Sequence, residues 1–227
     1  MQDLSTAYFI NDLSGYITGN RIPPNGPNIL RTSNGGLSWD VLPFSYGNVF
    51  SKLGFINFNT GYGSFGGLKK TTNAGANWLD LGLFFSVNDF SFFDNQNIFT
   101  CGSKGSLESS TNGGLNWSAN SSGFYGSFLC IKFFDANTGI AAGGGRYGYT
   151  GTYLRTTNAG VNWDSSSIDL EPLENIYLLN QNTGYVTGYG KIFRTTNNGA
   201  SFAAFPTRSP YPRCALCSPN ASTGYCA

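Results

Sequence analysis

One eight-residue motif recurs five times along this 227-residue chain, and it constrains the fold more than any other feature. The motif reads S/T-x-N-x-G-x-x-W/F, and its copies begin 39, 39, 46 and 39 residues apart. All four tryptophans of the chain occupy its last position, where the fifth copy has phenylalanine. The copies lie at residues 32–39, 71–78, 110–117, 156–163 and 195–202. A period near 40 residues indicates an array of equivalent structural units.

The motif contains the residues of a tight turn between two strands. Its asparagine can bond nearby backbone N–H groups through the side chain, and its glycine can adopt a positive φ. The aromatic residue at its end then covers the hairpin and packs between neighbouring units. We expect a structural role for these residues, because five equivalent copies cannot all be one active site. They are Asn34, Gly36, Trp39, Asn73, Gly75, Trp78, Asn112, Gly114, Trp117, Asn158, Gly160, Trp163, Asn197, Gly199 and Phe202.

Each copy is preceded by an apolar stretch and by a second polar turn, such as NFNTG or NQNTG, which leads into a glycine-rich segment. Together with the strands around the motif, this makes four strands in about 40 residues, the spacing of a propeller blade. We therefore predict an all-β fold, a five-bladed β-propeller of four-stranded antiparallel blades, with a short Cys/Pro-rich C-terminal tail. The propeller spans residues 1–206, with blades at about 4–43, 44–83, 84–122, 123–168 and 169–206, and the tail spans 207–227. We expect blades one and five to close the ring; an open arc completed by a partner is the alternative.

The motif resembles the Asp-box, or bacterial neuraminidase repeat, with asparagine in place of the usual aspartate. The longer unit, NxNTGYxxG followed by TTNxGxNW, resembles the propeller repeats of the photosystem II assembly and stability factor family, which occur in many secreted bacterial proteins. The resemblance covers roughly residues 4–206. It implies a propeller fold and an extracellular or cell-surface location, but it does not specify a function, because one fold hosts many functions.

Charge and composition exclude several classes of function. Lysine and arginine number 13 and aspartate and glutamate 12, so the net charge of +1 gives no reason to expect nucleic acid or an anionic membrane. The chain has no histidine, which excludes Ser-His-Asp triads, Cys-His dyads and histidine-ligated zinc. No apolar run approaches the length of a spanning helix, and no signal peptide is visible in these residues. We expect no cofactor and no metal.

The five cysteines are disulfide candidates, and their odd number leaves at least one thiol free or shared with another chain. The CxxC spacing in the tail does not make a zinc site without further ligands, and it lacks the βαβ context of a redox motif. We expect a disulfide-stapled or intermolecular tail in an oxidising compartment. In the blades, the first two cysteines can form either a disulfide or a pair of small buried residues. The five are Cys101, Cys130, Cys214, Cys217 and Cys226.

The two ends of the predicted blades differ. The asparagine turns at one end are uniform, whereas the loops at the other end vary and are rich in aromatic residues and arginine, as binding hot spots are. Flat aromatics beside asparagine and serine also suit sugar rings, although any one of these rings can instead fill a gap between blades. The candidate binding residues are Arg21, Tyr46, Phe85, Tyr125, Arg146, Tyr147 and Tyr149.

Three functional hypotheses follow. The first is a non-catalytic, secreted or cell-surface binding or scaffold propeller that engages a protein or glycan through its variable loop face. The second is a structural subunit of an extracellular filament or surface assembly, in which the partners are copies of the chain itself. The third is a sialidase-like glycosidase, which the sequence disfavours. Its arginine candidates, Arg31, Arg155 and Arg194, share one repeat position, and no pair of carboxylates stands out for glycoside hydrolysis.

Overall fold

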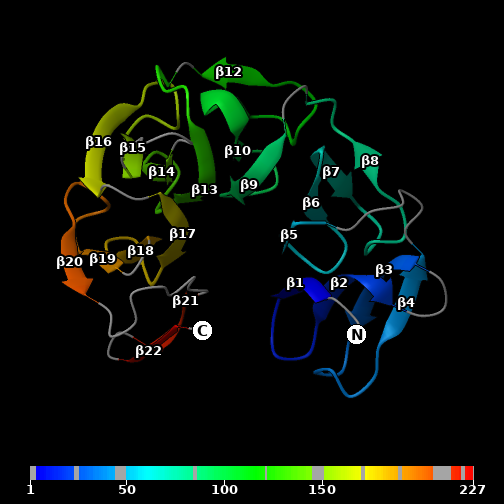
Figure 1. Ribbon diagram of the computed structural model, residues 1–227. Coiled ribbons are helices and arrows are strands. Elements are labelled where there is room, and N and C mark those ends of the chain that lie inside the picture. Colours follow the sequence, from blue (N-terminus) through cyan, green and yellow to red (C-terminus); the bar gives the residue numbers. More distant parts are fainter. Residues whose placement is uncertain are drawn as a thin grey trace. The chain divides into compact units, whose positions relative to one another are not determined.

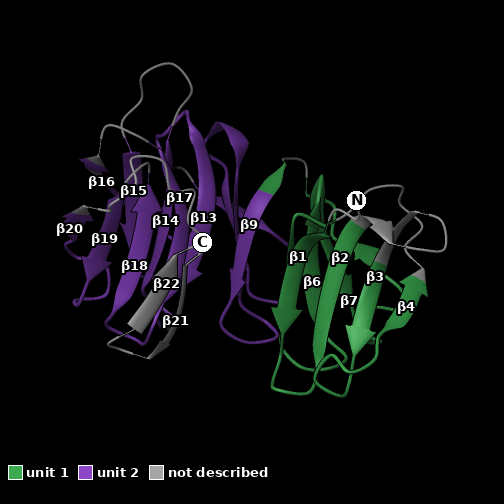
Figure 2. Ribbon diagram, turned by 60° about the horizontal axis from the view of Figure 1, so that its bottom comes forward, with its two compact units in different colours: residues 1–87 green, residues 88–227 purple. Residues whose placement is uncertain are grey.

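The computed structural model describes residues 4–22, 26–43, 50–83, 86–120, 122–144, 151–169, 172–188, 191–206, 216–220 and 223–226. The chain forms two compact units, Met1–Val87 and Asn88–Ala227 (Figure 2). The described residues form five four-stranded antiparallel sheets, which confirms an all-β propeller of five blades. No helix in this part of the chain has the length and apolarity needed to cross a membrane.

The first unit contains blades one and two, and in each the strands pair in chain order (Figure 1). Blade one consists of β1 (Leu4–Phe9), β2 (Gly15–Ile22), β3 (Gly26–Thr32) and β4 (Asp40–Pro43). Blade two consists of β5 (Lys52–Phe55), β6 (Gly61–Phe65), β7 (Gly67–Thr71) and β8 (Leu79–Asp80).

The second unit contains blades three to five with the same up-and-down order. Blade three consists of β9 (Val87–Phe92), β10 (Ile98–Gly102), β11 (Leu107–Ser110) and β12 (Ser118–Asn120), with a 3₁₀ turn, η1 (Ser103–Gly105), between β10 and β11. Blade four consists of β13 (Ser127–Phe133), β14 (Gly139–Gly144), β15 (Gly151–Thr156) and β16 (Asp164–Asp169). Blade five consists of β17 (Leu173–Leu178), β18 (Gly184–Gly188), β19 (Lys191–Thr195) and β20 (Ala203–Pro206).

The tail contains a further hairpin, β21 (Leu216–Asn220) and β22 (Thr223–Cys226), which the sequence analysis did not predict. Closure of the ring by blades one and five stays a prediction.

The asparagine turn is held by one set of side-chain bonds, illustrated by blade two. The hydroxyl of Thr71 donates to Oδ1 of Asn73 (3.1 Å) and accepts from the backbone N–H of Gly75 (3.0 Å). Oδ1 of Asn73 also accepts from the N–H of Asn77 (2.9 Å). The same threonine or serine, asparagine and glycine bonds recur in the other four blades. The motif therefore closes the turn locally, as predicted, and its glycine has φ +81° here.

Two of the tryptophans pack on rings that bridge neighbouring blades. Trp78 Nε1 donates to the carbonyl of Gly75 (3.1 Å), and its ring lies against Phe50 and edge-on to Phe55. Phe55 in turn stacks on Tyr16 of blade one at 3.8 Å between ring centroids. Blades three and four repeat this arrangement with Phe99, Phe133 and Trp163. In the fifth copy the ring of Phe202 packs against Tyr153 of blade four. The aromatic position of the motif therefore contributes to the core between blades.

The second polar turn explains the glycine that follows it. Asn57 Oδ1 accepts from the N–H groups of Asn59 and Thr60, both at 2.9 Å. The chain then enters β6 at Gly61, which pairs with Phe55 on β5. A Cβ at Gly61 would overlap the ring of Phe55, so only glycine lets the ring lie across the neighbouring strand.

Blades three and four hold this turn with an aspartate where the other blades have asparagine. The backbone N–H groups two and three residues further on donate to Asp94, and these bonds lower the pKa of its carboxyl. At Asp135 burial acts to raise the pKa, but the equivalent N–H groups outweigh it and the pKa is lowered. These carboxylates therefore stabilise the fold above their unfolded pKa near 3.8. That contribution is lost as the pH falls through their lower folded pKa.

We expect the double variant Asp94→Asn, Asp135→Asn to fold normally, because blades one, two and five use asparagine at this position. Its free energy of unfolding should fall less than that of the wild type between about pH 5 and about pH 2, since two carboxylates with lowered pKa are gone. Urea denaturation at both pH values, followed by tryptophan fluorescence, measures this difference. An identical pH dependence in both proteins would show that these two carboxylates do not contribute to the loss of stability at low pH.

Blades one and two, and blades three and four, are joined by bonds from side chains on one first strand to main-chain atoms of the next blade. In the first unit, the hydroxyls of Ser5 and Tyr8 on β1 donate to the carbonyls of Phe50 (3.1 Å) and Phe55 (3.0 Å). In the second unit, Asn88 Nδ2 donates to the carbonyl of Phe128 at 2.8 Å. Among the described strands, β5 and β13 each pair on one side only, and these side chains bond carbonyls in or just before those strands.

Candidate functional site

The described part of the variable loop face centres on the loop between β12 and β13, at residues 122–126. Its anchor is the hydroxyl of Ser122, which donates to the carbonyl of Gly105 in η1 (2.9 Å) and accepts from the N–H of Phe124 (3.1 Å). The N–H of Gly105 donates to the carbonyl of Gly126 (2.6 Å). The ring of Phe124 packs on the fully buried Phe128, with 5.0 Å between centroids. The loop is therefore fixed at both ends and by one inward-facing ring.

Gly105 makes this anchoring possible. Its φ is +69°, and a Cβ built on it would overlap the carbonyl oxygen of Phe124. The preceding Lys104 also has a positive φ of 57°. The close approach of η1 to the loop therefore depends on the absence of a side chain at this glycine.

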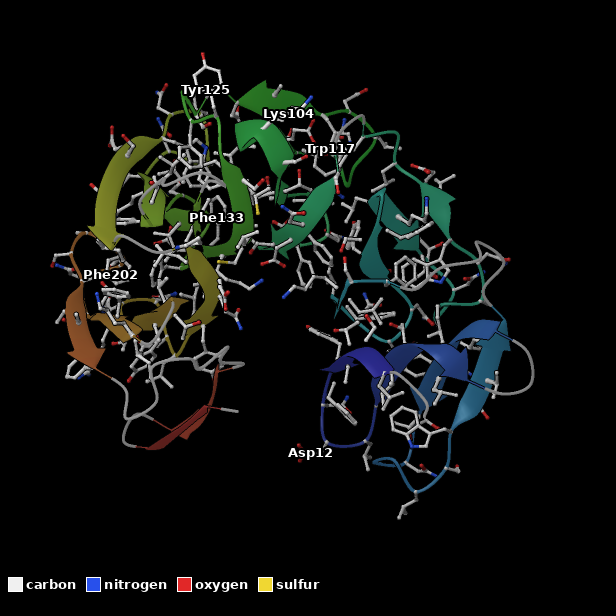
Figure 3. All side chains as sticks on the ribbon, in the orientation of Figure 1. Asp12, Lys104, Trp117, Tyr125, Phe133 and Phe202 are labelled. Carbon is white, nitrogen blue, oxygen red and sulfur yellow. The ribbon has the colours of Figure 1, made fainter. Side chains whose placement is uncertain are left out.

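Tyr125 is the residue that this loop presents. It is 90% exposed, although it lies directly after the inward-facing Phe124. Figure 3 shows its side chain pointing away from the strands of blades three and four. A rigidly mounted tyrosine contributes large contact area at low entropic cost on binding, because only two torsions need to be fixed.

A hollow of about 280 Å³ borders the same loop. Its wall from blade three is Ser122, Gly123 and Phe124, and its wall from blade four is the outer pair of strands, β15 and β16. Thr152 lies on β15 and Ser165 on β16. Ser165 pairs with Leu154 on β15, and Leu154 lies in the core that blade four shares with blade three. The lining residues are Ser122, Gly123, Phe124, Thr152, Ser165 and Ser166.

The described lining of this hollow is hydroxyl-rich, and no charged side chain is among its described residues. With the ring of Phe124 in its wall and Tyr125 next in the chain, it combines an apolar surface with hydroxyl donors and acceptors. This chemistry suits a neutral, polar ligand group, such as a main-chain amide, an asparagine or glutamine side chain, or a sugar hydroxyl.

Most of the predicted binding residues lie outside the described part of the chain. Tyr46, Phe85, Arg146, Tyr147 and Tyr149 are outside the described residues. Arg21 lies within β2, but its side chain is not described. Tyr125 is thus the candidate that the structure places. The sequence analysis missed Thr152, Ser165 and Ser166, which are ordinary strand residues. The run of three serines in β16, at residues 165–167, was the signal available for finding two of them.

The blade cysteines do not form a reactive centre. Cys101 and Cys130 are free and buried, so the structure has the pair of small buried residues and no disulfide between them. Burial raises the pKa of the Cys101 thiol well above its usual value, and the nearby Asp89 carboxylate adds to this shift. Cys217 and Cys226 lie in the tail hairpin with side chains that are not described, and Cys214 is outside the described residues.

Two of the three arginines that share one repeat position have structural contacts. The guanidinium of Arg31 lies 3.1 Å from Asp40 and over the ring of Phe58. Arg155 Nε donates to the carbonyl of Asn198 in blade five at 2.9 Å. Among the described residues, no group of three histidine, cysteine, aspartate or glutamate side chains is placed to hold a metal ion.

Comparisons with solved structures agree with the propeller fold. A structure described as YCF48 bound to D1 peptide superposes with a TM-score of 0.69 at 13% identity, covering 97% of this chain and 74% of that one. YCF48 from Cyanidioschyzon merolae gives a TM-score of 0.72 at 16% identity, covering 99% and 77%. The GH74 enzyme of Niastella koreensis gives 0.73 at 16% identity, and this chain spans only 38% of its length. No family model and no curated protein matches the sequence. At these identities the similarity establishes the fold alone.

Proposed function

We propose that this protein is a non-catalytic binding or scaffold propeller that acts outside the cell or at its surface. It engages a protein or glycan through the loop face, and the Tyr125 site is part of that surface. The observation that carries the proposal is the anchored loop at 122–126, which presents a tyrosine that is 90% exposed beside a hollow whose described lining is rich in hydroxyl groups. The extracellular location is supported by the resemblance of the repeats to those of secreted bacterial proteins.

Two further observations support binding over catalysis. Several aspartates have structural roles. Asp94 and Asp135 accept hydrogen bonds within turns. Asp40 and Asp80 form ion pairs with basic side chains. Of the solved propellers that this chain resembles, YCF48 has a structure bound to a D1 peptide. A peptide segment is accordingly the first ligand class to test, and a glycan is the second.

We expect Tyr125→Ala to weaken ligand binding about tenfold or more, because exposed, preorganised tyrosines are frequent hot spots. Wild-type and variant proteins would be applied to a peptide array and a glycan array, and hits would be quantified by calorimetry. Leu115→Ala is the matched control, because Leu115 is 78% exposed but lies in the asparagine turn at the other end of blade three. Equal binding by all three proteins would exclude Tyr125 from the binding surface.

A further inference from the structure

Lys104 holds a backbone conformation that its residue type rarely adopts. It lies in η1 with φ 57° and ψ 31°, in the left-handed region that suits glycine and, to a lesser degree, asparagine and aspartate. The other described residues with a positive φ that are not glycine occupy one position of the asparagine turn and belong to the repeat, namely Ala74, Ala159 and Asn198. Lys104 is outside that motif. Strained backbone of this kind persists where the surrounding structure fixes it, and it gathers at ligand-binding sites.

The turn that contains Lys104 is bonded directly to the loop that carries Tyr125. The N–H of Gly105, the residue after Lys104, donates to the carbonyl of Gly126, the residue after Tyr125, at 2.6 Å. The carbonyl of Gly105 accepts from the hydroxyl of Ser122 at the start of the same loop (2.9 Å). Lys104 and Tyr125 thus each stand one residue before a member of the same hydrogen bond. Both side chains are exposed, so they contribute to one surface.

Lys104 gives the described part of this surface a positive charge. The acidic residue nearest to it in the chain is Glu108, whose carboxyl is buried and accepts from the hydroxyl of Thr100 at 3.3 Å. Lys104 takes part in none of the ion pairs between described residues, which are Arg31–Asp40, Lys69–Asp80 and Lys132–Asp89. The charge of Lys104 is therefore available to a ligand.

These features set two requirements for a ligand of the Tyr125 site. A carboxylate can pair with the ammonium group of Lys104, and a neutral polar group can bond the hydroxyls of the hollow beside Tyr125. Lys104 belongs to blade three, whereas Thr152 and Ser165 come from blade four, so a ligand that meets both requirements spans the loop. An extended polypeptide carries carboxylates and amides at intervals of about 3.3 Å per residue. An acidic sugar, in contrast, holds its carboxylate and its hydroxyls on one ring.

We propose that Lys104 is a specificity-determining residue of the Tyr125 site and that the ligand is a polypeptide segment with a carboxylate. The carboxylate comes from an aspartate or glutamate side chain or from the end of the chain. The inference rests on the proposed function, because it concerns the same surface. Tyr125 provides contact area, the hollow accepts a neutral polar group, and Lys104 selects acidic segments over neutral ones.

A matched peptide array tests the ligand class. Each short synthetic peptide is present in an acidic form and in a neutral form with asparagine for aspartate and glutamine for glutamate, and each form has a free or an amidated C-terminus. Among peptides whose binding is weakened by Tyr125→Ala, we expect the acidic form to bind about fivefold more tightly, the upper end for one exposed charge pair. The modification that removes this preference identifies the source of the carboxylate. The preference should disappear between about 0.01 M and about 1 M salt, because the Debye length falls from about 30 Å to about 3 Å.

The variant Lys104→Asn tests the residue. Asparagine adopts a positive φ more readily than lysine, so we expect a urea midpoint no lower than that of the wild type, and a change in binding then has no origin in unfolding. The variant should bind the acidic and neutral forms equally, whereas Lys104→Arg should keep the preference. Arg31→Gln is the charge-matched control, because it also removes one positive charge but lies beside the asparagine turn of blade one. It should keep the preference as well.

The possible failures of this proposal and of the proposed function differ. Equal binding of acidic and neutral peptides by the wild type, or a preference that persists in Lys104→Asn, would overturn the role of Lys104 and leave the Tyr125 site standing. Tyr125-dependent binding of glycans without any of peptides would overturn the polypeptide ligand. If no peptide and no glycan depended on Tyr125, the proposed function would fail together with this inference.

Discussion

Replacing Asp89 by alanine should lower the free energy of unfolding by about 3 kcal/mol or more, because it breaks a buried charge pair from one side. Asp89 on β9 is 4% exposed, and its Oδ2 accepts from the backbone N–H of Ile131 and from Nζ of Lys132, both at 3.1 Å. The variant leaves that N–H without its acceptor and the ammonium group without its counter-ion. The Lys132 side chain is 35% exposed. We therefore expect a loss of stability at the low end of the range found when one partner of a buried ion pair is removed. Urea denaturation of the full chain measures it.

The Arg31–Asp40 pair provides the matched control for this experiment. Its nitrogen-to-oxygen distance is also 3.1 Å, but the Asp40 side chain is 68% exposed. Exposed pairs contribute little, so Asp40→Ala should cost less than about 1 kcal/mol. Equal losses in the two variants would mean that the burial of Asp89 has no bearing on its contribution.

Gly105→Ala should destabilise the protein by about 3 kcal/mol and abolish binding at the Tyr125 surface. Part of the cost is the positive φ of 69°, which alanine adopts with difficulty. The larger part is the overlap of the new Cβ with the carbonyl of Phe124, which forces the loop at 122–126 away from η1. Tyr125 then loses its fixed position. Denaturation and the array experiments measure the two effects.

Gly123→Ala separates the effect of backbone conformation from that of the overlap. Gly123 lies in the same loop with φ +63°, but a Cβ there would meet no atom within 4 Å. We expect a cost of only about 1 kcal/mol in the free energy of unfolding, measured by the same denaturation. If Gly123→Ala and Gly105→Ala behaved alike, close packing between η1 and the loop could not be the reason for a glycine at position 105.

The blades and their turns could be predicted from the sequence because their causes are local. Asn73 bonds atoms no more than four residues away, so the same short motif produces the same turn in every blade. The aromatic positions followed from the repeat as well, since the same motif ends with an aromatic residue in every blade. The structure therefore confirms the five four-stranded sheets.

The features that depend on contacts between distant segments could not be predicted. The pairing of Asp89 with Lys132 requires the relative register of β9 and β13, which no sequence period specifies. The hollow beside Tyr125 arises where a loop of blade three meets the hydroxyl face of β15 and β16. The tail hairpin was missed for a different reason. It has the NASTGY turn but lacks the Asn-Gly-Trp motif that marks the five blades.

The bonds between first strands differ in kind from those within a blade. Inside a blade, the strands are held by continuous main-chain ladders, as in the pairing of β13 with β14. Between neighbouring blades of one unit, the contacts are made by side chains: rings such as Tyr16 and Phe55 stack, and Tyr8 and Asn88 donate to backbone carbonyls of the next blade. Under tension along the chain, neighbouring blades within a unit should therefore separate from one another before either of them unravels. The blade is thus the unit of mechanical unfolding as well as the unit of the repeat. We expect the protein to unfold under force in steps of one blade.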